Sequence, residues 1–140
     1  MTEAATEDLP DAGPKPKQGV ALALLFGTAA VGLALDQATK ALALAKLGGG
    51  QVVQVADHWL QFRLVRNAGA AFSLGESLTW AFTILATVVV VGVVVVARRV
   101  TNCGWAFALG LLVAGAAGNL ADRLFREPGF GRGHVIDFID

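Results

Sequence analysis

Three long stretches without a charged residue constrain the fold more than any other feature of this sequence. They cover residues 18–35, 77–97 and 100–121, which is 18, 21 and 22 residues, and about 20 residues are needed to cross a bilayer as a helix. Backbone groups in hydrocarbon must bond within their own segment, so each stretch is predicted to be helical despite its glycine and valine. Hydrophobic residues make up 55% of the chain, above the roughly 45–50% of soluble domains. The sequence therefore predicts an all-α polytopic membrane protein with transmembrane helices at about 18–36, 78–97 and 102–121.

Residues 1–17 differ sharply from the rest of the chain. They carry four acidic residues and three prolines, a composition that cannot bury a core. A cleavable signal peptide would have a basic start and a shorter apolar run. We therefore expect a disordered tail followed by an uncleaved first membrane helix.

The segment 37–77, between the first two predicted helices, is too polar to be another crossing. Leu60, Phe62 and Leu64 alternate with Gln61 and Arg63, a pattern typical of short strands. We expect a small extracytoplasmic β element lying at the membrane surface.

The third predicted helix carries small residues on one face. Gly110, Ala114 and Gly118 recur at a spacing of four, which lets a neighbouring helix approach closely. Asp122 continues this stripe, and Asn119 lies three residues before it on nearly the same face. Two interpretations remain open: a polar functional site at the membrane boundary, or a helix end that simply reaches water.

Four polar clusters interrupt the apolar chain, and in a three-helix arrangement all four lie on one side of the membrane. Asp36 and Lys40 are spaced i, i+4, so the simplest alternative for them is a surface ion pair worth at most about 0.5 kcal/mol. Asp137 has apolar neighbours on both sides, a setting suited to a general acid or base. Ionisable groups at membrane depth indicate a functional site. The clusters are DQATK (36–40), NAGAAFS (67–73), GNLADR (118–123) and GHVIDF (133–138).

Other chemistries fit less well. Ser73 lacks the G-x-S-x-G elbow of a serine nucleophile, no H-E-x-x-H zinc motif occurs, and Cys103 is the only cysteine, so no intrachain disulfide can form. The chain has 11 basic and 11 acidic residues, which argues against a nucleic-acid partner. A non-catalytic membrane subunit or small transporter is the serious alternative, because Asp and Asn at helix ends also line ion paths.

Read in order, DQATK, NAGAAFS, GNLADR and VIDF resemble the successive signatures of bacterial lipoprotein signal peptidases (signal peptidase II), over roughly residues 20–140. The resemblance implies a four-helix protein of the bacterial cytoplasmic (inner) membrane, with cytoplasmic termini and its site at the outer face. It also implies a monomer in contact with membrane lipids that needs no metal or cofactor. The implied substrate is a lipid-modified prolipoprotein, cut N-terminal to its diacylglyceryl-cysteine.

The resemblance assigns one of two catalytic aspartates to Asp137. The second belongs to an N-x-A-D motif at the start of a fourth helix, which Asp140 does not match, so it is expected beyond residue 140. Residues 18–140 are thus expected to be a membrane peptidase domain that is incomplete at its C-terminus, and inactive by itself. Two such carboxylates share one proton and activate water without a covalent intermediate. Matching substrate-binding or supporting positions are Asp36, Lys40, Asn67, Gly69, Phe72, Asn119, Asp122 and Arg123.

Membrane orientation gives a first testable prediction. A count of loop Lys and Arg, four on one side and seven on the other, would place the N-terminus outside, whereas the resemblance implies that it is cytoplasmic. We expect reporter fusions after Gly49 to localise outside the cytoplasm and fusions after Thr101 to localise inside. The reverse pattern would support the charge count and contradict the orientation of the family.

Overall fold

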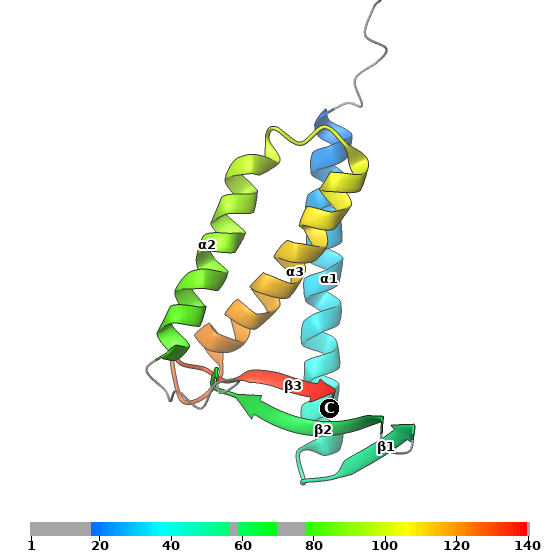
Figure 1. Cartoon of the computed structure of the whole chain (residues 1–140), viewed down its shortest axis with the longest axis vertical. Helices are drawn as coiled ribbons and strands as arrows, with labels where there is room; N and C mark the ends of the chain where they lie inside the picture. The colour runs from blue at the N-terminus through cyan, green and yellow to red at the C-terminus, as the bar shows by residue number, and fades with distance from the viewer. Residues whose placement is uncertain (1–17, 57–58, 70–77, 140) are drawn as a thin grey trace, which may run out of the picture.

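The computed structural model describes residues 18–56, 59–69 and 78–139, and within them three helices stand side by side with a small sheet at one end (Figure 1). All three helices are long and apolar enough to cross a membrane, as the sequence predicts. Asn102 caps the third helix by accepting a hydrogen bond from the Trp105 amide, which satisfies one of the free N–H groups at a helix start. The elements, in order, are α1 (Gln18–Leu47), β1 (Val52–Ala56), β2 (Leu60–Asn67), α2 (Thr79–Ala97), α3 (Cys103–Phe125) and β3 (Val135–Ile139).

Helix α1 is longer than predicted. It does not end near residue 36 but continues to Leu47, so the segment expected to begin at residue 37 starts inside the helix. Its 30 residues correspond to about 45 Å of helix, against about 30 Å of hydrocarbon in a bilayer. The DQATK motif therefore lies within the helix, and Leu42–Leu47 form a helical extension beyond the apolar stretch. Gly50, at φ +79°, turns the chain into β1, a conformation that glycine adopts without strain.

The small-residue stripe of α3 lies against α1, as predicted. A Cβ at Gly110 would be 2.7 Å from the Leu25 backbone oxygen, and a Cβ at Gly32 of α1 would be 2.6 Å from the Ala114 Cβ. These distances leave no room for larger side chains. Backbone-to-backbone packing of this kind is how membrane helices associate when apolar burial against lipid gives little driving force.

Helix α3 also packs on α2, so it links the two outer helices. The buried apolar cluster is small and includes Ala21, Leu25, Ala97 and Ala106. Large apolar side chains cover the outward faces instead, which suits a surrounding of lipid rather than water. Exposed examples are Val31, Leu35, Ile84, Leu85, Val88, Val95 and Leu111.

The sheet is antiparallel, in the order β1-β2-β3 (Figure 1). Strands β1 and β2 form the β element expected between the first two helices. The third strand, β3, was not predicted: it contains the VIDF motif and pairs with β2 so that Val65 lies opposite Asp137. This pairing brings the fourth polar motif beside the second.

Close packing of α3 on α1 yields a prediction with an internal control. Gly110→Ala should lower the free energy of unfolding by about 1–3 kcal/mol, because the added methyl meets the rigid backbone of α1. Gly115→Ala, in the same helix with nothing within 4 Å of its added Cβ, should be neutral or stabilising by up to about 1 kcal/mol. Denaturant titration in detergent measures both. Equal effects of the two substitutions would contradict the packing described.

Candidate active site

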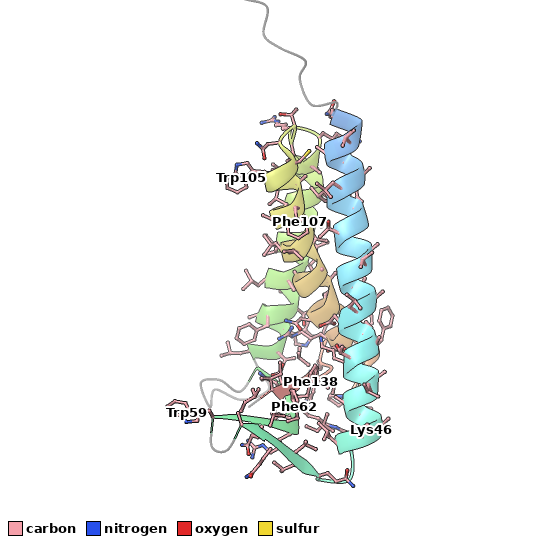
Figure 2. All side chains as sticks on the ribbon, turned by 90° about the vertical axis from the view of Figure 1, so that its right-hand side faces the viewer. Lys46, Trp59, Phe62, Trp105, Phe107 and Phe138 are labelled. Carbon is pink, nitrogen blue, oxygen red and sulfur yellow. The ribbon has the colours of Figure 1, made fainter. Side chains whose placement is uncertain are left out.

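The four polar motifs meet where α1, α3 and the sheet come together. Figure 2 shows polar side chains gathered between the helix ends and the strands, close to the labelled Phe138. Thr79 and Thr83 attach the start of α2 to the same region, donating hydrogen bonds to the carbonyls of Ala68 and Gly131. Among the described residues, no group of three His, Cys, Asp or Glu side chains is placed to hold a metal ion.

Lys40 lies at the centre of this region. Its Nζ atom is 2.9 Å from Asp36 Oδ2 and 2.8 Å from Asp122 Oδ2, and it donates a hydrogen bond to Asn119 Oδ1 at 3.2 Å. The side chain is only 4% exposed. The pair with Asp36 is therefore not a surface ion pair; Lys40 instead links α1 to α3.

Asp122 is fully buried, so the interpretation of a helix end reaching water is wrong for this residue. Its Oδ1 atom accepts from Arg126 Nε at 2.5 Å, and its Oδ2 atom accepts from the Ile136 backbone N–H at 3.2 Å. Gln37 Nε2 lies 3.4 Å from Oδ1. Together with Lys40, these donors approach the carboxylate from α1, from the end of α3 and from β3. Buried charge is tolerated only with such compensation.

Gly118 makes the approach of α1 to this cluster possible. A Cβ there would overlap the Asp36 carboxylate. The Gln37 amide also donates to the Gly118 carbonyl at 3.2 Å. The small-residue stripe thus continues into the polar cluster and sets the distance at which Lys40 meets Asp122.

Asp137 has a different environment. It is half-buried on β3, and Asn67 of β2 donates to its Oδ2 atom at 2.9 Å. Asn67 is the one described side chain that hydrogen bonds to this carboxyl group. The Asn67 Oδ1 atom in turn accepts from the Gly69 N–H at 2.7 Å, which fixes the amide orientation.

Gly69 is suited to its place for two reasons. Its φ of +101° lies in the region that favours glycine, and a Cβ there would approach the Phe82 ring to 2.8 Å. The ring also lies under Arg123, whose Cζ atom is 5.7 Å from the ring centroid, a cation–π distance. Phe82 therefore lies against both Gly69 and Arg123.

Arg123 is buried and close enough to interact electrostatically with both Asp122 and Asp137. Its Nε atom has no hydrogen-bond partner within the described part of the chain. A buried, unsatisfied donor beside a carboxylate is costly for stability.

The structure thus brings together most of the predicted site residues: Asp36, Lys40, Asn119 and Asp122 in one cluster, with Asn67, Gly69, Asp137 and Arg123 beside it. Phe72 lies outside the described residues. Sequence reasoning missed Gln37, Phe82 and Arg126. Arg126 follows Asp122 at i+4, a spacing that favours ion pairs on a helix and could have revealed it; Phe82 lies in an apolar run that gives no such signal.

The fold and the cluster define a polytopic membrane protein with a buried charged site at one end of its helices. This chain belongs to the signal peptidase II family: the family model described as Signal peptidase (SPase) II matches residues 28–140. With its spanning helices, the family fits a protein of the bacterial inner membrane.

Individual relatives agree with this family. The chain is 46% identical over 139 residues to the lipoprotein signal peptidase of Mycolicibacterium smegmatis, covering 99% of this chain and 57% of that protein. It is 50% identical over 115 residues to the lipoprotein signal peptidase of Streptomyces griseus, covering 82% and 59%. The chain thus spans little more than half the length of these two relatives.

A solved structure supports the fold independently. A bacterial membrane enzyme determined by the in meso method at 1.9 Å resolution superposes with a TM-score of 0.70 and 28% identity, covering 90% of this chain and 76% of that one. The helices and the sheet therefore have an experimental counterpart.

The central position of Lys40 gives the next prediction. Lys40→Met should lower the free energy of unfolding by about 3–5 kcal/mol, because it leaves two carboxylates of a buried cluster without their shared cation. Lys46→Met is the matched control: Lys46 is exposed near the end of the same helix (Figure 2) and should change stability by less than about 0.5 kcal/mol. Denaturant titration in detergent measures both, and similar values for the two variants would contradict the role given to Lys40.

Proposed function

We propose that this protein is the membrane endopeptidase that removes signal peptides from lipid-modified bacterial prolipoproteins, cutting N-terminal to the diacylglyceryl-cysteine. Membership of the signal peptidase II family supports the substrate class. Asp137 is proposed as one carboxylate of an aspartic-type catalytic pair. The proposed site faces the outer side of the membrane, the orientation that the family resemblance implies.

One observation carries the assignment of Asp137: Asp122 and Asp36 are held by ion pairs, whereas no ion pair holds Asp137 within the described residues. Cationic and backbone donors approach both oxygens of Asp122, and Asp36 is paired with Lys40. Asp137 is half-buried and meets a single described side-chain donor, Asn67. A group that must take up and release a proton needs access to water and freedom from fixed ion pairs.

The second carboxylate of the pair requires a separate argument. Residues 119–122 read Asn-Leu-Ala-Asp, which also fits the N-x-A-D pattern, so Asp122 is a formal candidate. Its contacts argue against that role, because Lys40, Arg126 and the Ile136 amide all favour the ionised carboxylate, whereas the role needs a group that takes up and releases a proton. We therefore propose that Asp122 positions β3, and that Asp137's partner comes from outside the described residues.

The proposed reaction follows from the chemistry of such pairs. Two carboxylates a few ångströms apart share one proton, so one activates water while the other protonates the peptide. The pH dependence would then report the pair rather than Asp137 alone. Arg123, which interacts electrostatically with Asp137, would stabilise the negative charge that develops on the carbonyl under attack.

The remaining polar residues are proposed to act indirectly, by holding Asp122 and through it the strand that carries Asp137. Lys40, Asp36 and Asn119 hold Asp122, and Asp122 holds the Ile136 amide next to Asp137. The exposed apolar faces of the helices suit a substrate that carries acyl chains and reaches the enzyme within the bilayer. The scissile bond of such a substrate lies near the membrane boundary, at the level where the helices end and the sheet begins.

The proposal predicts different effects for two aspartates of the full-length protein. Asp137→Asn should reduce precursor cleavage at least about 100-fold, because asparagine keeps the shape but cannot exchange the proton. Asp36→Asn should leave measurable turnover, because it disturbs position rather than proton transfer. The assay is cleavage of a lipid-modified prolipoprotein, with the membrane yield of each variant measured to separate lost chemistry from lost folding.

Two outcomes would contradict the assignment. Near-normal cleavage by Asp137→Asn at normal yield would exclude that residue and return the non-catalytic subunit or transporter as the leading function. Loss of turnover in Asp122→Asn at normal yield, with Asp137→Asn active, would show that Asp122 is the catalytic carboxylate.

A further inference from the structure

A cavity lies on the opposite face of the sheet from Asp137. It has a volume of about 270 Å³ and is lined by residues from the last turn of α1, the end of α3, the loop after α3, and strands β2 and β3. Side chains alternate between the faces of a strand, so Ile136, which lines the cavity, points away from the side of Asp137. Arg66, the β2 partner of Ile136, lines the same cavity. The cavity thus lies on the other face of β3 from Asp137, and it shares Arg126 with the buried cluster around Asp122.

The polar lining of this cavity is mainly cationic. Arg66 lines it from β2, His134 lines it from the position directly before β3, and Arg126 lines it from the C-cap of α3. Within the described residues, neither the Arg66 nor the His134 side chain has a hydrogen bond or an ion pair. Arg126 directs its Nε to Asp122 and its Nη2 to Gln37 Oε1 at 3.4 Å. Glu127 is the one carboxylate of the lining, against the two arginines Arg66 and Arg126.

The apolar part of the lining is formed by Leu44, Phe125 and Ile136. Phe125 is 83% exposed although it ends a membrane-spanning helix, so its ring borders both the cavity and the surroundings. Leu44 belongs to the part of α1 that exceeds the length of the hydrocarbon core. A bilayer centred on the charge-free part of α1 would place the cavity at the depth of the lipid headgroups.

We propose that this cavity binds a phosphate group, and that its source is the headgroup of an anionic phospholipid. The guanidinium of Arg66 and the imidazole of His134 would donate to the phosphate oxygens, as basic pockets at membrane boundaries do for lipid headgroups. The first atoms of the glycerol ester arm would lie against Leu44, Phe125 and Ile136. The volume is below the roughly 300–1,000 Å³ of pockets that enclose drug-sized ligands, so it suits a headgroup and not its acyl chains.

A lipid bound in this cavity would lie next to a residue that contacts the buried cluster. Arg126 borders the cavity and also contacts Asp122, so an occupied site lies one side chain away from the buried cluster. The proposal does not depend on catalysis, since both residues used to test it lie outside the candidate active site. Its failure is therefore distinguishable from failure of the proposed function.

The test is titration of the detergent-solubilised 140-residue chain with short-chain phosphatidylglycerol, followed by native mass spectrometry or calorimetry. Parallel titrations use short-chain phosphatidylcholine and inorganic phosphate. We expect saturable binding of phosphatidylglycerol that Arg66→Gln and His134→Gln each weaken about tenfold, since each removes a donor to the phosphate. Lys46→Gln removes a charge near the same end of α1 without lining the cavity and should change affinity less than about twofold.

The separate titrations identify the source of the phosphate. Binding of phosphatidylglycerol that millimolar phosphate does not displace supports the lipid headgroup. Binding of inorganic phosphate alone, with the same sensitivity to Arg66→Gln and His134→Gln, supports a phosphate site but overturns the lipid as its source. The site would be overturned if Lys46→Gln weakened phosphatidylglycerol binding as much as the cavity variants do. It would also be overturned if neither cavity variant, at an unchanged melting temperature, weakened that binding.

Discussion

The buried ion pair between Lys40 and Asp122 is the interaction on which the arrangement of the whole site depends. Charges at this depth are unfavourable unless each is compensated, and here one lysine meets two carboxylates and an amide oxygen while Asp122 also accepts from β3. The small residues of α3 make this possible, because only a glycine at position 118 lets the Asp36 carboxylate approach so closely. Backbone packing and charge compensation therefore act together to fix α1 against α3 and to place the start of β3.

This arrangement separates the roles of the three described aspartates of the site. Asp122 and Asp36 belong to a closed network of fixed partners, whereas Asp137 stands at its edge with Asn67 as its described hydrogen-bond donor. The alternation of β3 then places Asp137 on one face and the basic cavity on the other, with Ile136 between them. A short strand thus separates the proposed site of peptide hydrolysis from a proposed site for lipid phosphate.

The sequence alone predicted the structural features that depend on local residue patterns. Charge-free length predicted three helices, alternation predicted β2, and the spacing of Gly110, Ala114 and Gly118 predicted the face of α3 that meets α1. Long-range pairings gave no such signal. The end of α1 was placed too early because Asp36 and Lys40 look like the polar boundary of a crossing, while their buried partners on α3 keep the helix intact. Strand β3 was missed because its five residues are stabilised by β2, some 70 positions earlier.

The role of Asp122 as a structural anchor through Lys40 is tested most directly by a double-mutant cycle on unfolding free energy in detergent. The cycle compares Lys40→Met, Asp122→Leu and the double variant with the wild type. We expect a coupling of about 1–3 kcal/mol, with the double variant more stable than the sum of the single effects would allow, because removing both charges leaves neither one buried alone. Additive effects, within about 0.5 kcal/mol, would show that the two residues are energetically independent and would contradict the anchor.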